Sequence, residues 1–467
     1  MVFSSLEFLG LFLPLFLLCY AATPRAWRNV TLLAFSWVFY GWWSPSFLWV
    51  LVGVTLVGWV AGLLLTSIHH QTLRKGLLAL SILSLAGMLA FFKYANLLVE
   101  SLIQPLALAG DRDFHWERLL LPIGISFIVL QAISYIVDVY RRVVPVERSF
   151  IDYGAYQAMF SQLIAGPIVR YSHVARELHG RSFELANIAA GLRYFMIGLS
   201  MKVIVADTIA PIADVAFQQS TPTLLDAWLG TFAYGMQLLF DFAGYSAMAI
   251  GIGCTLGFHF PRNFDAPYIS RSIQEFWRRW HMTLGSWLRD YLYIPLGGSR
   301  VTPWRIYLNL LIIMAISGLW HGADSLNFLL WGILHGIAMM IQRAWERHSG
   351  ITLPALPAWA LTMLFVFSAW VLFRAPDLAT AWSLYQGMAG LHGVGLSDDI
   401  ALVLRPIHLL TLMLACAFAA WPLWRSVGAS GWHRLNQLLY LWPIAGMLLS
   451  VALLASRGAS PFLYFQF

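Results

Sequence analysis

Two histidines in apolar surroundings, His281 and His321, are the residues of this sequence best suited to chemistry. A neutral imidazole is a natural general base toward a hydroxyl group near pH 7. A histidine at membrane depth is costly unless it is paired or functional, so a functional role is the default hypothesis. Gly318 and Gly322 flank His321, which favours close backbone approach or a helix break beside a cavity. His335, in the apolar stretch ILHGI, is a rival for which a structural role is favoured.

His281 stands in the richest basic stretch of the chain, residues 269–291. At helical spacing, Trp277, His281 and Leu284 share one face and the arginines another, which predicts an amphipathic helix at the inner membrane interface. One interpretation is an interfacial anchor with a buried structural histidine. The other is a cavity wall whose arginines attract an anionic cytosolic ligand, such as the acyl donor acetyl-CoA. The candidates for its phosphates, with lipid anchoring equally favoured, are Arg278, Arg279 and Arg289.

Three further residues are candidates to support the site. Asp290 pairs either with a neighbouring arginine, which is favoured, or with a histidine. Asp241, in the stretch FDFAGYS, lies within an apolar span, so it either orients a catalytic group or makes an interhelical hydrogen bond. Trp280 precedes His281 directly and is the third supporting residue.

The elements that must position these residues are membrane-spanning helices, because the composition allows little else. Of the 467 residues 60% are hydrophobic and 11% are charged, whereas a soluble domain carries about 25% charged residues. This excludes a soluble enzyme, a disordered chain and a nucleic-acid binder. Three well-separated cysteines suggest neither a disulfide framework nor a zinc site, and no metal is expected.

The apolar runs predict an all-α polytopic membrane protein with about 11–12 transmembrane helices in a single domain, residues 1–467. The predicted spans are 5–22, 30–43, 46–66, 77–98, 119–139, 186–205, 227–257, 306–320, 326–341, 354–373, 403–422 and 437–455. The shorter segment 150–168 predicts a re-entrant or half-inserted helix, since it ends in Ala-Gly-Pro.

Basic residues divide the loops into two alternating sets, with 21 Lys and Arg in one and 5 in the other. Cytoplasmic loops accumulate Lys and Arg, so the richer set is placed inside. Both termini then lie outside, which for a bacterial inner membrane means the periplasm.

Three stretches resemble the signatures of a known family, the membrane-bound O-acyltransferases (MBOAT family). They are FWRRWH (276–281), WLRDYLYIPLGG (287–298) and GLWHG (318–322), within a signature region at 260–345. Other stretches resemble the bacterial branch that serves alginate, cellulose or peptidoglycan O-acetylation, and the resemblance covers the whole chain. These are MVFSS (1–5), LPIGISF (121–127), GPIVRY (166–171), FDFAGYS (240–246) and PFLYFQF (461–467).

The resemblance implies tilted helices around a central cavity or tunnel, with His321 as the catalytic histidine and His281 as a second important one. It implies acetyl-CoA as the cytosolic donor and passage of acetyl across the membrane for an exopolysaccharide such as alginate or cellulose. A periplasmic or membrane-anchored SGNH-type acetyltransferase, with a Ser-His-Asp site, and a polysaccharide synthase complex are the implied partners. The alternative is an acetyl-group transporter, or a scaffold of the same complex, without covalent turnover.

The C-terminal aromatic tail, residues 457–467, lies on the predicted outer side and contains Tyr464. In the related D-alanylation system a similar aromatic motif is proposed to carry the acyl group on its tyrosine, so the resemblance suggests a relay through Tyr464. A phenol, with a pKa of about 10, is a good leaving group, and a tyrosyl acetate would keep much of the transfer potential of a thioester. The alternatives are an aromatic belt residue that docks the tail and a partner-binding motif.

Overall fold

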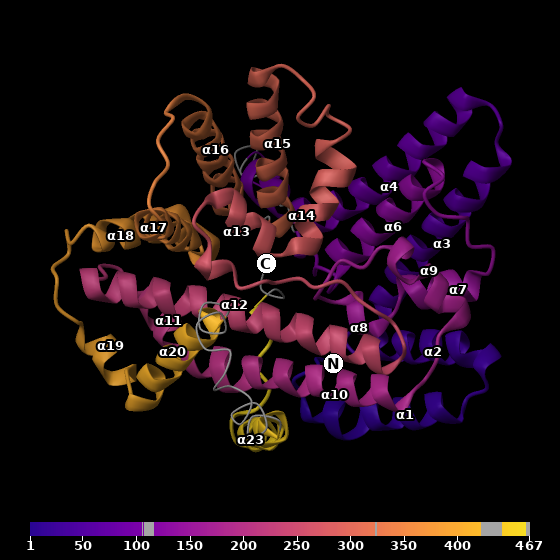
Figure 1. The fold of residues 1–467 in the computed structure, drawn as a ribbon, viewed down its shortest axis with the longest axis horizontal. Helices are drawn as coiled ribbons and strands as arrows, with labels where there is room; N and C mark the ends of the chain where they lie inside the picture. The colour runs from indigo at the N-terminus through magenta and orange to yellow at the C-terminus, as the bar shows by residue number, and fades with distance from the viewer. Residues whose placement is uncertain (105, 107–115, 323–324, 422–440, 464–467) are drawn as a thin grey trace. The chain divides into compact units, whose positions relative to one another are not determined.

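The structure, a computed structural model, is helical throughout the described residues (Figure 1), which confirms the predicted all-α class. The described ranges are 1–104, 106, 116–322, 325–421 and 441–463. The chain divides into two compact units. Unit 1 comprises residues 1–195 and 248–261, and unit 2 comprises residues 196–247 and 262–467. The single domain expected from the sequence stays a prediction.

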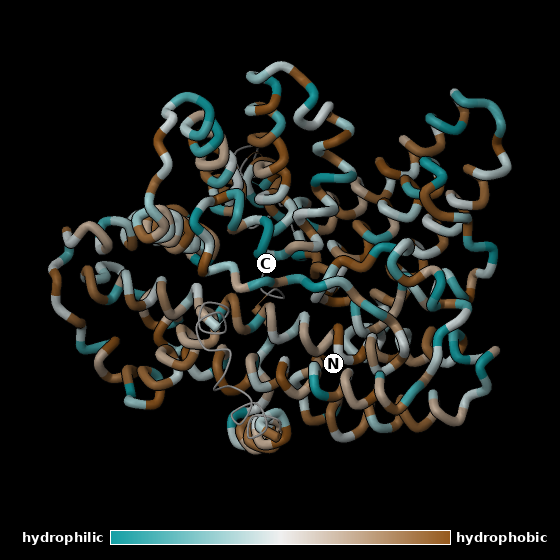
Figure 2. The backbone as a smooth tube through the Cα atoms, in the orientation of Figure 1, coloured by the Kyte–Doolittle hydropathy of each residue, from teal (hydrophilic) through white to brown (hydrophobic). Residues whose placement is uncertain are grey.

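Unit 1 is built mainly from the N-terminal helices, of which α3, α4 and α6 pack side by side (Figure 1). Its helices are η1 (Phe8–Phe12), α1 (Leu13–Ala22), η2 (Arg25–Trp27), α2 (Arg28–Gly41), α3 (Pro45–Ser67), α4 (Gln71–Leu98), η3 (Val99–Ile103), α6 (Ile125–Tyr140), α7 (Phe150–Gln157), α8 (Phe160–Leu163) and α9 (Tyr171–Gly180). Two helices, α10 (Leu185–Ser200) and α12 (Leu224–Thr255), contribute residues to both units. Hydrophobic residues follow the helix bodies, and hydrophilic residues gather at the connections (Figure 2).

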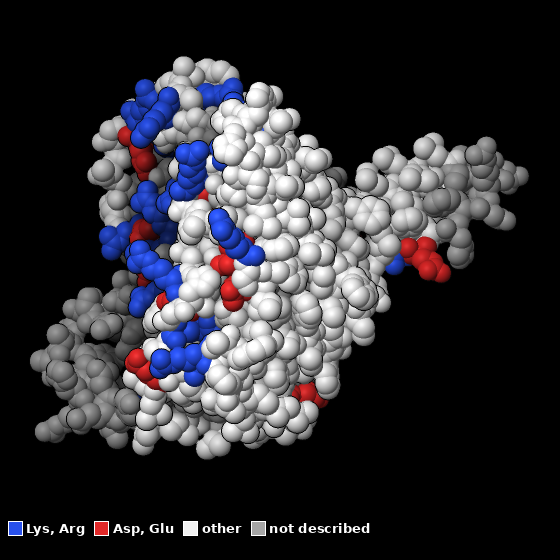
Figure 3. Space-filling view, turned by 90° about the vertical axis from the view of Figure 1, so that its right-hand side faces the viewer, with Lys and Arg blue, Asp and Glu red and all other residues white. Residues whose placement is uncertain are grey.

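Several loops that the charge pattern places on the same side of the membrane contact one another in unit 1. They are the connections near residues 29, 74, 140–152 and 178. Asn29 Nδ2 donates to Leu178 O (3.0 Å) and to Asp152 Oδ1 (2.6 Å). The Arg74 guanidinium donates to Tyr140 O (3.3 Å). Tyr140 ends α6, and the connection that follows it leads to α7, which contains Asp152. On the side where α3, α4 and α7 lie in Figure 1, Lys and Arg gather in a band along one edge, beside a face with few charged residues (Figure 3).

Unit 2 contains the remaining helices and both signature histidines. They are η4 (Met201–Ala206), α11 (Asp207–Gln218), η5 (Pro267–Ile269), α13 (Ile273–Arg279), α14 (Met282–Leu288), η6 (Arg289–Tyr293), α15 (Pro303–His321), α16 (Asn327–His348), α17 (Ala355–Arg374), α18 (Leu378–Met388), α19 (Asp398–Val403), α20 (Pro406–Ala419) and α23 (Trp442–Arg457). Proline opens α15, where its missing N–H costs nothing because the first turn has no intrahelical acceptor for it. Buried side chains of α12 and α17 supply the largest share of the apolar core, and α11, α13, α16, α18 and α20 add to it.

Six helical segments in the described residues are long and apolar enough to cross a membrane, which confirms a multi-pass membrane protein. They are Pro45–Ser67, Gln71–Ile103, Leu185–Gln218, Leu224–Thr255, Pro303–His321 and Ala355–Arg374. Four shorter apolar helices add Phe8–Ala22, Ile125–Tyr140, Pro406–Ala419 and Trp442–Arg457. The predicted re-entrant segment, 150–168, forms two short buried helices, α7 and α8.

The close packing of α15 on α16 depends on two glycines. A Cβ atom on Gly318 would collide with the carbonyl oxygen of Phe328, and one on Gly332 would collide with that of Met314. The two glycine Cα positions therefore let the helix backbones approach each other closely. This contact sets the position of the last turn of α15, which carries His321.

Candidate active site

His281 lies at a break between two short helices, so the continuous amphipathic helix expected over 269–291 is wrong. Its backbone is left-handed, with φ of 43°, and it caps α14. The break is stabilised from elsewhere in the chain, because Met282 N donates to Asn263 O (2.9 Å). Hydrogen bonding to a distant loop thus overrides the helical periodicity and turns the His281 side chain into the interior, where it is 1% exposed.

The hydrogen bonds around Asn263 define the protonation state of His281. Asn263 Oδ1 accepts from the Thr283 hydroxyl (2.8 Å) and lies 3.1 Å from His281 Nδ1, while Asn263 Nδ2 donates to Ser246 Oγ (3.0 Å). An acceptor opposite Nδ1 requires the proton on Nδ1, which leaves the ring lone pair on Nε2. Burial lowers the pKa of His281 to about 3, so the ring is neutral at pH 7. It is thus a neutral imidazole with its basic nitrogen on Nε2.

His321 is the last residue of α15 and is buried against aromatic rings. Its ring centroid lies 5.3 Å from that of Trp331 and 4.9 Å from that of Trp320. The Trp320 centroid also lies 6.1 Å from His281. The two histidines predicted from separate motifs therefore share one tryptophan neighbour. Gly322 follows with extended backbone, so the helix does end at His321, as the flanking glycines indicated.

His335, the rival histidine, is fully buried in α16. Its Nδ1 accepts from Trp277 Nε1 (3.2 Å), and its ring lies 4.9 Å from Trp331. These contacts are those of a side chain that joins α16 to α13, in agreement with the structural role favoured for it.

The arginine candidates differ in how far neighbouring carboxylates neutralise them. Arg279 contacts both Glu275 (3.0 Å) and Asp265 (3.2 Å). Arg289 pairs with Asp290 (2.7 Å), which is the arginine pairing favoured for that aspartate. Arg278 is exposed, forms no ion pair with a described residue, and is therefore the candidate best able to meet an anion. Trp280 is buried, and its ring packs on Phe264, Phe276 and Trp370.

Asp241 is fully buried in α12 and pairs with a residue that the sequence reading left unassigned, Lys202 (2.6 Å). Lys202 also contacts Asp207 (2.7 Å). The available signal was a lysine inside an apolar span, where a charge needs a partner. The second oxygen of Asp241 accepts from the backbone N–H of Leu463 (2.9 Å), which belongs to the C-terminal tail.

The described part of the C-terminal tail ends in two buried residues, Phe462 and Leu463. Phe462 is 2% exposed, and its ring centroid lies 4.7 Å from Tyr245 and 5.7 Å from Phe242. Phe242 in turn lies edge-on to His281 at 4.7 Å. Tyr464 lies outside the described residues, and it directly follows Leu463, the last of them.

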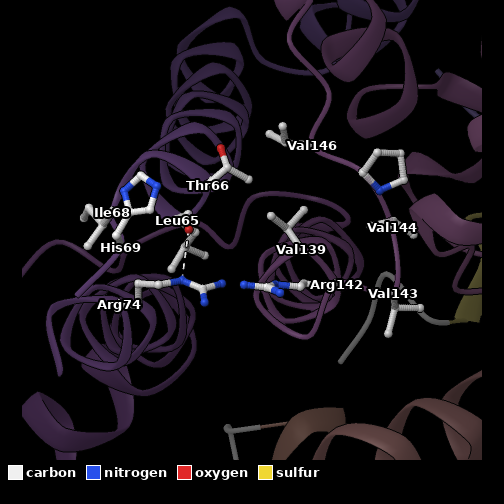
Figure 4. Close-up of a pocket in the computed structure, with 11 residues that line it drawn as sticks. Leu65, Thr66, Ile68, His69, Arg74, Val139, Arg142, Val143, Val144 and Val146 are labelled. Atoms are coloured by element: carbon white, nitrogen blue, oxygen red, sulfur yellow. Dashed lines mark hydrogen bonds between the residues drawn. The ribbon is translucent and has the colours of Figure 1, made fainter. Parts of the chain in front are cut away.

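Unit 1 contains a pocket and a cluster of possible metal ligands. A pocket of about 480 Å³ is lined by Arg74, Arg142 and His69 among apolar side chains, and the two guanidinium groups point toward one another (Figure 4). Glu147, Asp152 and His179 bring ligand atoms within 4.8 Å of one another. The two carboxylates already accept hydrogen bonds from protein groups, such as the Tyr171 hydroxyl on Glu147 (2.8 Å), and His179 Nε2 lies 2.9 Å from Glu147. Neither feature involves a signature histidine.

Both signature histidines lie in one helical unit, and comparison with known proteins places the chain in a family. The model of the membrane-bound O-acyltransferase family, MBOAT, matches residues 106–385. The chain therefore belongs to this family and is a membrane O-acyltransferase.

Individual relatives are similar over most of the chain. The probable alginate O-acetylase AlgI of Azotobacter vinelandii is 42% identical over 501 residues, covering 100% of both chains. The corresponding protein of Pseudomonas aeruginosa is 43% identical over 417 residues, covering 89% of this chain and 80% of the relative. A peptidoglycan O-acetyltransferase of Helicobacter pylori is 37% identical over 425 residues, covering 84% and 79%.

Proposed function

We propose that this protein is an O-acetyltransferase that takes acetyl from cytosolic acetyl-CoA and passes it across the bacterial inner membrane for an exopolysaccharide such as alginate or cellulose. The observation that carries the proposal is the shared contact of His281 and His321 with Trp320, one aromatic ring away from the buried C-terminal tail. Similarity to alginate and peptidoglycan O-acetylating relatives supports acetyl as the group that is transferred.

His321 acts as the general base in this proposal, and His281 positions the donor. A thioester is already activated, so the protein has to position the reactants, exclude water and move one proton. The ring of His281 is neutral and carries its lone pair on Nε2, which suits it to accept a hydrogen bond from the donor. Arg278 is the arginine best able to attract the donor phosphates, because Arg279 and Arg289 are already paired with carboxylates.

The acceptor in this scheme is the phenol of Tyr464. Its oxygen attacks the thioester carbonyl while His321 takes the phenol proton; the carbon–sulfur bond breaks, and the proton passes to the departing thiolate of CoA. A serine of an SGNH-type partner then attacks the tyrosyl acetate, and the tyrosine regains its proton. Burial of Phe462 and Leu463, which immediately precede Tyr464, supports this role of the tail.

The proposed sidedness follows the charge distribution. The strongly basic loops lie on the cytoplasmic side, and both termini lie in the periplasm, where the SGNH-type partner and a polysaccharide synthase complex act. The meeting of basic connections at one end of unit 1 supports this arrangement.

Release of CoA from labelled acetyl-CoA by the purified protein, with its partner present, tests the proposal. His321→Ala is expected to reduce the rate at least about 100-fold, as for loss of a general base, with unchanged thermal unfolding. His69→Ala, an exposed histidine of unit 1, is the matched control. Equal turnover by His321→Ala refutes the catalytic assignment, and translocation of intact acetyl-CoA without CoA release favours the transporter alternative.

The relay is tested separately by mass spectrometry of the C-terminal tryptic peptide, residues 458–467. Incubation with acetyl-CoA in the absence of the partner is expected to add one acetyl group to this peptide. Tyr464→Phe keeps the ring and removes the hydroxyl, so it abolishes both the label and polymer acetylation. Full polymer acetylation by Tyr464→Phe rules out the relay.

A further inference from the structure

Three charged side chains from two helical segments converge inside unit 2. Lys202 Nζ lies 2.6 Å from Asp241 Oδ1 and 2.7 Å from Asp207 Oδ1. The exposed fractions of these side chains are 4% for Lys202, 1% for Asp241 and 15% for Asp207. Charges buried within membrane segments are rare and costly unless their hydrogen-bonding groups are satisfied, so the cluster is expected to have a function.

The C-terminal tail completes the hydrogen bonding of this cluster. An ammonium group has three donors, and two of those on Lys202 serve the two carboxylates. The third is directed to Ser460 Oγ (2.9 Å), which itself donates to Asp207 Oδ1 (2.7 Å). Leu463 N donates to the remaining oxygen of Asp241 (2.9 Å). Both ends of the ion pair therefore depend on the tail for a partner.

Aromatic packing then links the held tail to the active site. Phe462 lies between the two anchoring residues, Ser460 and Leu463, and its ring packs on Tyr245 and Phe242. Phe242 contacts the ring of His281. Holding the tail at Lys202 and Asp241 consequently fixes where the chain leaves Leu463.

We propose that Lys202, Asp207 and Asp241 form a clamp for the protein's own C-terminal segment, residues 460–463. Lys202 and Asp241 are positioning residues: they hold residues 460–463 so that Phe462 packs on Phe242, the ring that contacts His281. The docking of the tail is inferred from these contacts alone. The effect of docking on turnover rests on the proposed acyl transfer. The competing interpretation is an ion pair that only joins α12 to η4.

Tail accessibility tests the clamp without any use of activity. The full-length protein in detergent is treated with carboxypeptidase Y, and the C-terminus is followed by intact mass. Trimming of the wild type is expected to stop before Leu463. The paired variant Lys202→Met/Asp241→Asn removes one positive and one negative charge, so the net charge of the cluster is unchanged, and Asp207 keeps the Ser460 hydroxyl as a donor. It is expected to lose residues 460–463 at least about tenfold faster, because cleavage follows the population of the released tail.

Two matched variants make this result specific. Lys93→Met removes another buried lysine, in α4 of unit 1, and is expected to leave the tail protected. The tail-side variant Ser460→Ala/Phe462→Ala leaves the ion pair intact and is expected to release the tail as well. It keeps the proposal testable if the buried-charge variant does not fold. If Lys202→Met/Asp241→Asn or Ser460→Ala/Phe462→Ala resists carboxypeptidase as well as the wild type does, the clamp is refuted.

Turnover gives the second readout. The Lys202→Met/Asp241→Asn variant is expected to lose about 100-fold in kcat, as for a misplaced reactant, with the KM for acetyl-CoA within about twofold of wild type. Lys202→Arg retains a cation and is expected to recover part of the loss. A raised donor KM with unchanged kcat would overturn the positioning role. Full activity of Tyr464→Phe would refute the relay but would not affect the trimming result. Failure of the relay can therefore be distinguished from failure of the clamp.

Discussion

Replacing Asn263 by aspartate is expected to make turnover sensitive to pH through His281. The new carboxylate keeps an oxygen opposite His281 Nδ1, now 3.1 Å from the amide oxygen, so the ring tautomer is preserved. It adds a negative charge where the wild type has none. The flanking rings, Phe242 and Trp320, carry no charge, so the carboxylate would be the dominant new influence. An opposite charge at this distance raises a histidine pKa by roughly 1–3 units.

The magnitude follows from the starting value. Burial holds the pKa of His281 at about 3, so the variant is expected at roughly 4–6. At the upper end of this range about one ring in ten stays neutral at pH 5, whereas the wild-type ring stays neutral there. Protonation removes the lone pair on Nε2, and activity falls as pH falls through the raised pKa.

The assay is kcat for CoA release at pH 4.5–8, expressed as the ratio of Asn263→Asp to wild type so that titrations common to both cancel. The ratio is expected to be flat above about pH 7 and to have fallen by pH 5 about 11-fold if the raised pKa is 6, about twofold if it is 5 and about 1.1-fold if it is 4. At low pH the Asn263→Asp variant is expected to lose activity but to lose less folding stability than the wild type. In the wild type the depressed pKa means that the unfolded state binds the proton first, so stability falls as pH drops below about 6.5; the carboxylate reduces that loss. A ratio that is constant across this range, in a variant whose His281 pKa is 5 or above by NMR titration, refutes a functional role for neutral His281.

Two other predictions concern packing and donor binding. Gly318→Ala is expected to lower the free energy of unfolding by about 1–3 kcal/mol, because the added methyl meets the Phe328 carbonyl. Gly87 has open space around it, so Gly87→Ala is the control and is expected to be neutral or stabilising in thermal unfolding. Arg278→Gln is expected to raise the KM for acetyl-CoA about threefold to tenfold, and Arg289→Gln less, since Asp290 already neutralises Arg289; equal KM values in both variants and the wild type would exclude Arg278 from donor binding.

The helical class and the end of α15 at His321 could be predicted because they depend on local patterns. Long apolar runs define spans, and glycines beside His321 mark the end of α15. The alternating charge in the loops likewise predicted which connections of unit 1 meet. These signals need no knowledge of which helix packs on which.

The break at His281 could not be predicted, because its cause lies in another segment. Neither glycine nor proline occurs at the break, and the spacing of apolar residues continues through it. Asn263 supplies the acceptor for Met282 N and the side-chain oxygen for Thr283. Likewise, Lys202 and Asp241 are visible as charges in spans, but their pairing depends on how η4 packs against α12.

The stretch FDFAGYS in α12 contacts two neighbouring parts of unit 2 through helical periodicity. Residues four apart share a face. Asp241 and Tyr245 accordingly meet the tail, at Leu463 and Phe462. One position further along, Phe242 contacts the His281 ring and Ser246 accepts from the amide that orients it.

This division predicts separable defects. Tyr245→Ala is expected to release the tail to carboxypeptidase while the pH profile of turnover keeps its wild-type shape. Ser246→Ala is expected to loosen Asn263 and reduce kcat about threefold to tenfold, the cost of about one hydrogen bond, with the tail still protected. If each variant moved both readouts equally, tail holding and histidine orientation would be one cooperative function and not two faces of a single helix.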